Sequence, residues 1–279
     1  MVGLVRIVHP FPSALDATAA VAIALIAGAG LFSALRLGLG MLCLQFAIGI
    51  ANDLADASSD ALGKPDKPLP AGLLTSRQAG VALLATGAAG LASAASVGVA
   101  ALAVGVLGLA DGLLYDLRLK GTALSWAPFA AGVGLLPVYG WWGATGSWPA
   151  ALWGVAALAV LVGVALALAN ALADLEKDRR SEVRSIATAL GRGRTLVLDA
   201  ALMLAIQTIA LATAVSLGAG AWAQAAGSAG VCLGWLGVGL ASTGSERARQ
   251  AGWETQALGF LLLGAGWLSA LSSAGALGR

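Results

Sequence analysis

The feature that most constrains this chain is a series of apolar runs, each long enough to cross a membrane as a helix. Crossing about 30 Å of hydrocarbon takes roughly 17–25 helical residues. Lipid offers no hydrogen-bond partner to backbone amides, so each run is expected to be α-helical. Nine such runs occur, near residues 14–35, 37–55, 78–96, 98–115, 122–144, 149–173, 195–216, 219–241 and 253–274.

The composition agrees with this assignment. Apolar residues make up 59% of the chain and charged residues 11%, whereas soluble chains carry about 25% charged residues. Gly, Ala and Ser are frequent within the runs, as at Gly230 and Gly234, and small residues let membrane helices approach closely. We therefore predict an all-α fold, a polytopic membrane bundle of nine transmembrane helices around a central cavity.

The basic residues predict how these helices are oriented. With nine spans, the N-terminus and the loops after the second, fourth, sixth and eighth spans share one side. Of the 16 Lys and Arg residues, only Arg36 and Arg279 fall on the other side. By the positive-inside rule, we expect a multi-pass protein of the cell membrane with its N-terminus and these loops in the cytoplasm. The acidic residues lie on or near the same side, which is therefore the side equipped for chemistry.

Two acidic segments recur at corresponding places, at the ends of the second and sixth runs. Each has one Asn and two Asp residues at i, i+4 and i+8: Asn52, Asp56 and Asp60 in the first, and Asn170, Asp174 and Asp178 in the second. Four residues advance a helix by about 400°, so each triplet is expected on one helical face. The recurrence of this spacing suggests two related halves, about 1–120 and 121–279, within a single domain spanning residues 1–279.

Carboxylates so close together need a counter-charge. Two like charges about 6 Å apart repel by about 3 kcal/mol at an effective dielectric near 20. Either their pKa values rise or cations bind between them. Oxygen ligands without His or Cys favour hard ions, Mg²⁺ foremost, which usually binds through carboxylates and substrate phosphates together. The candidate metal ligands are Asn52, Asp53, Asp56, Asp60, Asn170, Asp174 and Asp178.

Basic residues accompany both acidic segments. Lys64 and Lys67 follow the first, Tyr115–Lys120 closes the fourth run, and Arg179 follows the second. Acids that hold metal, beside cations that reach phosphate oxygens, describe a site for a diphosphate or a nucleotide. Topology determination and contact with anionic lipid also explain some of these basic residues. For His9, we expect a structural role at the level of the lipid headgroups.

These segments resemble a known pattern. Asn52–Asp60 resembles the NDxxDxxxD motif, and Asp174–Asp178 the DxxxD motif, of the UbiA superfamily of intramembrane prenyltransferases. Lys64–Gly72 is similar to the RPxRPxxxG segment of that family, and Tyr115–Lys120 to its YxxxLK segment. The resemblance covers roughly residues 5–275, nearly the whole chain.

The resemblance implies a Mg²⁺-dependent enzyme similar to 4-hydroxybenzoate polyprenyltransferase, with a place in quinone biosynthesis. Such an enzyme transfers the prenyl group of an allylic diphosphate to a small aromatic or lipid acceptor, in contact with membrane lipid and without nucleic acid. The resemblance implies catalytic roles for Asp56, Asp60, Asp174, Asp178, Tyr115 and Lys120, and diphosphate binding by Asn52, Lys64, Lys67, Lys120 and Arg179.

Other readings stay open at this stage. A terpene cyclase of the same superfamily would use the same metal site but quench the carbocation internally, and a sugar-diphosphate variant would reverse donor and acceptor. A CDP-alcohol transferase needs Asp-Gly-x-x-Ala-Arg, which Asp111–Asp116 does not match. A cation transporter tends to place its carboxylates near the midplane of the membrane. Glu182 and Ser185 stand where the family commonly has Gly and Thr, and Lys64 and Lys67 where Arg is common, so the acceptor is not determined.

Overall fold

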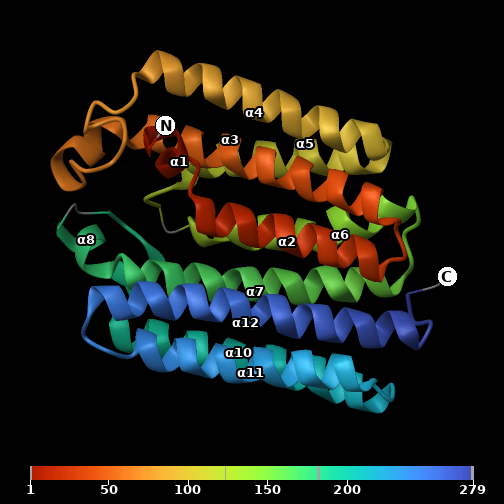
Figure 1. The fold of residues 1–279 in the computed structure, drawn as a ribbon. Coiled ribbons are helices and arrows are strands. Elements are labelled where there is room, and N and C mark those ends of the chain that lie inside the picture. The colour runs from red at the N-terminus through yellow and green to blue at the C-terminus, as the bar shows by residue number, and fades with distance from the viewer. Residues whose placement is uncertain (1, 123, 181–182, 278–279) are drawn as a thin grey trace. The chain divides into compact units, whose positions relative to one another are not determined.

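The computed structural model describes residues 2–122, 124–180 and 183–277, and every regular element in these ranges is helical (Figure 1). The prediction of an all-α fold is confirmed for this part of the chain. The elements are α1 (Val2–Ile7), α2 (Pro10–Ile26), α3 (Leu31–Gly63), α4 (Ser76–Val97), α5 (Val99–Leu114), the π-helix η1 (Tyr115–Leu119), α6 (Trp126–Thr145), α7 (Ala151–Ala173), α8 (Leu175–Arg180), α9 (Ile186–Leu190), α10 (Arg192–Ser216), α11 (Ala221–Ala241) and α12 (Glu246–Ser273).

Seven described helices are long and apolar enough to cross a membrane: α3, α4, α5 continued by η1, α7, α10, α11 and α12. The apolar helix α2 is shorter, with 17 residues. Helix α6 has 20 residues, but its glycines, tryptophans and prolines lower its hydropathy. Each of the nine predicted runs overlaps one of these nine helices, yet length and hydropathy alone establish seven spans.

The break between the first two predicted spans lies earlier than the sequence reading placed it. We expected the boundary at Arg36, but α2 ends at Ile26 and α3 begins at Leu31. Gly28 has a φ of +91°, and the Ala29 N–H donates to the Ala24 carbonyl at 3.0 Å. This is the usual glycine-terminated end of a helix, and it decides the boundary more strongly than one charged residue does.

Arg36 is accommodated inside α3. Its Nη1 donates to the Ser96 carbonyl at 3.1 Å, and its guanidinium lies over the Phe32 ring, 4.9 Å from the ring centroid. The Ser93 hydroxyl in turn donates to the Arg36 carbonyl at 2.7 Å. The long side chain thus reaches a carbonyl in the last turn of α4, and Arg36 does not end its own helix.

The helices pack into two compact units. The first comprises Met1–Lys120 with Val138–Gly146, and the second Gly121–Pro137 with Ser147–Arg279. The first unit has a fully buried cluster of Ile7, Ile50 and Ala79, which joins α1, α3 and α4. This cluster holds α3 in place beside its acidic segment. Whether the two halves of the chain are related repeats stays a prediction.

In the second unit, glycines bring α11 and α12 into backbone contact. A Cβ atom on Gly230 would lie 2.6 Å from the Gly259 carbonyl oxygen, and one on Gly237 would lie 2.6 Å from the Gly252 carbonyl oxygen. Atoms do not approach so closely, so a side chain at either position would force the helices apart. Small residues act here as membrane helix packing requires.

We predict that Gly237→Val destabilises the second unit by about 1–3 kcal/mol, because overpacking a close helix contact displaces backbone. Gly239→Val is the matched control, since it lies in the same helix and its Cβ would meet no atom within 4 Å. Thermal unfolding in detergent measures both. Equal midpoints for the two variants would contradict the close contact.

Candidate functional site

The first acidic segment lies on one continuous helix. α3 extends through it to Gly63, so Asn52, Asp53, Asp56 and Asp60 all project from the same element. Their spacing puts Asn52, Asp56 and Asp60 within roughly 80° of one another, and Asp53 about 100° from Asn52. The helical stripe that the spacing predicts is therefore present.

Lys67 joins two of these carboxylates. Its Nζ lies 2.8 Å from Asp53 Oδ1 and 2.7 Å from Asp60 Oδ2, and both aspartates are almost fully buried, with 3% and 6% exposure. The loop after α3 brings the lysine back, because the Lys67 N–H donates to the Lys64 carbonyl at 3.0 Å. The ammonium group thus lies between two buried acids of the stripe.

The charges of these acids control the protonation of Lys67. Burial by itself lowers the pKa of Lys67, but the hydrogen bonds and charges of Asp53 and Asp60 outweigh it and hold the pKa above its ordinary value. The lysine therefore stays charged throughout the physiological pH range. A buried charge that has both a counter-ion and hydrogen bonds is a stable arrangement.

His9 contacts the same cluster from the start of α2. Its Nε2 lies 3.1 Å from Asp53 Oδ1, and its φ of +48° is the one positive φ among the described non-glycine residues. A Cβ on Gly49 would come within 3.0 Å of the His9 ring, so this glycine makes room for it. We expected a structural role for His9 at the level of the lipid headgroups. The structure adds that His9 is hydrogen-bonded to Asp53.

Lys120 forms an ion pair with Asp56. The lysine follows η1, whose wider turn is closed by a hydrogen bond from the Lys120 N–H to the Tyr115 carbonyl at 2.8 Å. Such π-helical turns are frequent at functional sites. Tyr115 begins this turn and is half-buried, so η1 places the Tyr115–Lys120 segment beside the stripe of α3.

Asp116 in the same turn belongs to the site, although the sequence reading assigned it no role. The Asn52 Nδ2 donates to Asp116 Oδ1 at 2.8 Å. Asp116 is 7% exposed, and its Oδ2 is buried and without a hydrogen-bond partner among the described residues. The sequence signal was its place inside the Tyr115–Lys120 segment. This oxygen is one more hard donor next to the acids of α3.

Lys64 lies at the C-terminal end of α3 without a carboxylate partner. Its N–H donates to the Asp60 carbonyl at 2.7 Å, and the side chain is half-buried. Within the described ranges, its ammonium group makes no ion pair. Of the two lysines predicted after the first segment, the structure therefore brings only Lys67 to the acids.

The second acidic segment differs from the prediction in one respect. α7 ends at Ala173, and Asp178 lies on the separate short helix α8. The spacing itself is kept, because the Asp174 N–H donates to the Asn170 carbonyl at 3.2 Å and the Asp178 N–H to the Asp174 carbonyl at 2.9 Å. We expected one unbroken helical stripe here, and this was wrong. Asp174 leaves the helical conformation at its φ of −94° and ψ of 3°.

Lys177 neutralises acids of the second segment. Its Nζ lies 3.3 Å from Asp174 Oδ1 and 2.6 Å from Glu246 Oε1 at the start of α12. Burial lowers the pKa of Lys177, but the hydrogen bond and charge of Glu246, with those of Asp174, raise it above its ordinary value. As in the first unit, a lysine accompanies the motif carboxylate.

Arg249 of α12 supports the turn between α7 and α8. It is 1% exposed, and its Nε donates to the Leu172 carbonyl at 2.9 Å, its Nη1 to the Gly244 carbonyl at 2.9 Å, and its Nη2 to Glu176. Leu172 and Glu176 flank Asp174 in sequence. A single buried guanidinium therefore holds the backbone just before Asp174 and the Glu176 side chain just after it. The sequence reading took this arginine only as a topology signal.

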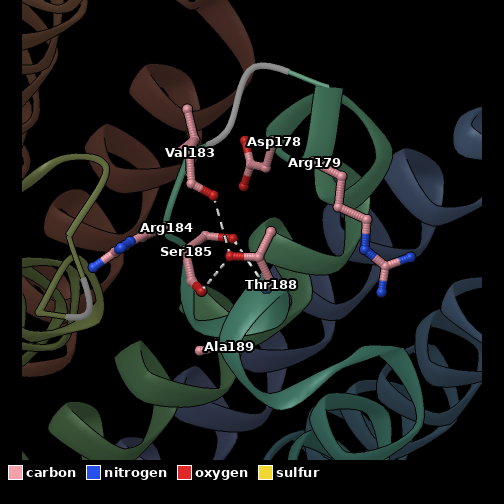
Figure 2. Close-up of a pocket in the computed structure, with 7 residues that line it drawn as sticks. All are labelled: Asp178, Arg179, Val183, Arg184, Ser185, Thr188 and Ala189. Atoms are coloured by element: carbon pink, nitrogen blue, oxygen red, sulfur yellow. Dashed lines mark hydrogen bonds between the residues drawn. The ribbon is translucent and has the colours of Figure 1, made fainter.

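A hollow of about 460 Å³ lies beside the second motif, lined by Asp178, Arg179, Val183, Arg184, Ser185, Thr188 and Ala189. Figure 2 shows Asp178 and Arg179 on one short helix with side chains directed to different sides. The Ser185 hydroxyl accepts from the Thr188 N–H at 3.4 Å and so caps α9. Arg179 is exposed at this hollow, and Glu182 lies outside the described residues.

Within the described ranges, no group of three or more His, Cys, Asp or Glu side chains is arranged to hold a metal ion. The motif acids are instead paired with lysine ammonium groups, Asp53 and Asp60 with Lys67 and Asp56 with Lys120. The metal and diphosphate roles assigned to the two motifs therefore stay predictions.

Comparison with known sequences gives one family. The sequence profile of the UbiA prenyltransferase family matches residues 16–264. No curated protein matches the chain in sequence.

Solved structures share the fold. A UbiA homologue from Aeropyrum pernix K1, in the apo form, matches with a TM-score of 0.77 at 24% identity, over 94% of this chain and 97% of that one. A UbiA homologue from Archaeoglobus fulgidus bound to GPP and Mg²⁺ matches with a TM-score of 0.71 at 15% identity, over 96% and 99%. Digeranylgeranylglyceryl phosphate synthase matches with a TM-score of 0.68 at 15% identity, over 96% of each chain.

We predict that Lys67→Met destabilises the protein by about 3 kcal/mol, because it leaves the buried Asp60 carboxylate unpaired and Asp53 with His9 as its remaining partner. Since the pKa of Lys67 is raised, its contribution is fully present below the ordinary value of 10.5 and is lost as the pH rises above it. The difference in unfolding midpoint from the wild type should therefore be constant between about pH 6 and 9 and shrink above pH 10.5. Lys64→Met is the control, and an equal loss in both variants would contradict the pairing.

We further predict that Arg249→Leu costs about 3 kcal/mol of stability, since the Leu172 and Gly244 carbonyls lose a buried donor. Arg192→Leu is the matched control. Arg192 also donates to two carbonyls, those of Ser242 and Thr243, but it is half-exposed. The midpoint of thermal unfolding should fall clearly less for Arg192→Leu than for Arg249→Leu. A larger fall for Arg192→Leu would contradict the role of burial.

Proposed function

Because this chain belongs to the UbiA prenyltransferase family, we propose that it is an integral-membrane, Mg²⁺-dependent prenyltransferase. In this proposal it ionises an allylic prenyl diphosphate and transfers the prenyl group to an acceptor, an aromatic ring such as 4-hydroxybenzoate or a related quinone precursor. Structures of related homologues bound to GPP with Mg²⁺ and to DMAPP with Mg²⁺ support the donor and the metal.

The observation that carries the proposal is the cluster at the end of α3. Asp53, Asp56 and Asp60 lie together with Lys67 and Lys120, which is a set of hard oxygen ligands and of cations. A diphosphate bound through a metal uses both kinds of group at once. A site of this composition suits a reaction in which negative charge accumulates on a leaving diphosphate.

The oxygen donors of the two motifs are of the kind that Mg²⁺ prefers, although within the described ranges they are paired with lysines and not grouped around a metal position. In the first unit, Lys67 Nζ lies within 2.8 Å of two buried carboxylates, which shows that their oxygens converge on one cation. The buried Asp116 Oδ2 without a partner adds a further oxygen. We assign metal binding to Asn52, Asp53, Asp56, Asp60, Asn170, Asp174 and Asp178. When bound, the ion supplies positive charge to the diphosphate oxygens and weakens the bond to the prenyl carbon.

The chain's own residues then act on the leaving group and on water. Lys120, Lys67, Lys64 and Arg179 bind diphosphate oxygens, and Tyr115 donates its hydroxyl to them. These contacts strengthen as the C–O bond breaks, so they lower the barrier more than they tighten substrate binding. The apolar helices exclude water, which would otherwise trap the carbocation. The new bond forms between the prenyl carbon and the acceptor, which releases one proton.

One observation keeps a lipid acceptor in view. Digeranylgeranylglyceryl phosphate synthase shares the fold over 96% of this chain, so a lipid alcohol is a second candidate acceptor. The apolar spans also let a prenyl tail enter sideways from the bilayer. We place the motif loops in the cytoplasm, where Mg²⁺ and soluble acceptors are available. A terpene cyclase remains the alternative reaction.

The function is tested with purified protein, Mg²⁺, radiolabelled prenyl diphosphates and a panel of acceptors that contains 4-hydroxybenzoate. Prenylated acceptor supports the transferase. Cyclised hydrocarbon formed without acceptor supports the cyclase instead. Diphosphate that stays intact while cations cross a vesicle wall contradicts both and supports transport.

We predict that Asp56→Asn lowers prenyl diphosphate turnover about 100-fold or more, because it removes a charge that holds metal. Asp66→Asn is the control, since Asp66 is exposed in the adjacent loop. Mg²⁺-dependent release of diphosphate measures both variants. Asp56→Asn with the wild-type rate at equal membrane abundance would remove Asp56 from the site.

A further inference from the structure

A polar pair is buried between α10 and α12, outside both acidic motifs. The Gln256 Nε2 donates to Asp199 Oδ2 at 3.2 Å, and both residues are 0% exposed. The two helices are long and apolar enough to cross a membrane, where a carboxyl group is costly and marks a functional site by default. Neither residue has a role in the function proposed above.

Two oxygen atoms of this pair have no hydrogen-bond donor. Asp199 Oδ1 and Gln256 Oε1 are both buried, and neither has a partner within the described part of the chain. Buried polar atoms in native proteins nearly always have one. Two unsatisfied acceptors on one hydrogen-bonded pair therefore indicate that a donor is missing when the pair is taken as an ionised acid and an amide.

Asp199 forms no ion pair within the described ranges, and its hydrogen bond comes from a neutral amide. Among the helices packed against α10, α7 and α9 contain no titratable side chain, and α11 contains only Cys232, which is exposed. The titratable residues of α12 are Glu246, Arg247, Arg249 and Glu254, and those of α10 are Arg192, Arg194 and Asp199 itself.

The basic residues of these two helices are engaged elsewhere. Arg249 lies seven residues before Gln256, about 10 Å along α12, and its guanidinium is bound to two carbonyls and to Glu176. Arg192 is bound to two carbonyls that follow α11. The other two are exposed: Arg194 and Arg247. A carboxyl group with neither water nor a cation beside it gives up its charge and binds a proton.

Packing keeps the Gln256 side chain in place. A Cβ atom on Gly237 of α11 would lie 2.5 Å from Gln256 Cγ and 2.6 Å from the Gly252 carbonyl oxygen. Gln256 thus lies where α11 and α12 are in close contact, and its side chain has little room to turn toward another partner. The missing donor is therefore expected on the pair itself.

We propose that Asp199 is a buried proton-binding site, whose Oδ1 carries a proton in the folded protein and donates it to Gln256 Oε1. A protonated aspartate has one O–H donor, and this donor satisfies both oxygens that lack a partner. Together with the bond from the Gln256 N–H to Asp199 Oδ2, it closes a ring of two hydrogen bonds between an acid and an amide. The pair is then neutral and connects α10 to α12 without burying a charge.

The proton makes this connection sensitive to pH. Unfolding exposes Asp199 and releases its proton, because an exposed Asp is ionised above about pH 5. The stability of the wild type therefore falls as the pH rises, until Asp199 ionises in the folded protein as well. Since α12 also carries Arg249, which supports the second motif, ionisation weakens the helix contact next to that support. This inference does not depend on the proposed function.

Asp199→Asn tests the proton, because an asparagine amide makes the same two hydrogen bonds and cannot ionise. Equilibrium unfolding of the full-length protein in mixed detergent micelles measures the unfolding constants. We expect the ratio of the wild-type to the Asp199→Asn constant to rise up to about 10-fold per pH unit from about pH 5 upward. Asp66→Asn, in an exposed position, is the matched control, and its ratio should stay constant. A constant ratio for Asp199→Asn as well means that Asp199 is ionised in the folded protein, which overturns the proposal.

Infrared spectroscopy observes the proton directly, because a protonated carboxyl has a carbonyl stretching band that a carboxylate lacks. The difference spectrum between the wild type and Asp199→Asn at about pH 6 should contain this band. Gln256→Met should shift it, since the acid loses its partner, whereas Gln250→Met, at an exposed glutamine of the same helix, should not. If Asp199→Asn does not fold, the shift in Gln256→Met decides. The absence of the band, or a band that Gln256→Met leaves in place, overturns the acid–amide pair.

Discussion

Charge neutralisation at the end of α3 is the interaction on which this structure depends. Three aspartates project from two turns of one helix, and two of them are almost fully buried. Ionised acids in such a place would repel each other and lose their hydration. Lys67 and Lys120, from a loop and from a π-helical turn, supply the opposite charge. The conformations of the loop and of η1 are therefore tied to the acids, and the positions of the acids to α3.

The second unit solves a similar problem with different residues. Its motif lies at a helix interruption rather than along a helix, and the interruption is supported by Arg249 from a distant part of the chain. Lys177 connects Asp174 to the start of α12 through Glu246. Because α12 packs on α11 through backbone contacts between glycines, the support is rigid. A catalytic constellation needs such support to keep its geometry.

Periodicity and length predicted the long helices, because hydrophobicity acts over whole turns. The same spacing argument predicted the stripe of Asn52, Asp56 and Asp60. It failed at Gly28, where local backbone conformation overrides a charge, and at Asp174, where a helix end falls inside a motif. It could not predict the contacts of His9, Asp116 and Arg249. Their partners are 44, 64 and 73 residues away, and only tertiary packing brings such residues together.

The length of α3 has a consequence for the reaction proposed above. With 33 residues, the helix is about 50 Å long, against about 30 Å of hydrocarbon. The helix is therefore longer than the hydrocarbon layer is thick, and its acidic segment lies at its C-terminal end. One continuous helix thus extends from the membrane surface, where a metal ion and a charged diphosphate can be hydrated, into the hydrocarbon layer, where an isoprenoid chain is soluble. In the proposed reaction, a prenyl diphosphate lies along this one helix, with its chain in the hydrocarbon layer and its diphosphate at the membrane surface. The released diphosphate then reaches water without crossing the hydrocarbon layer.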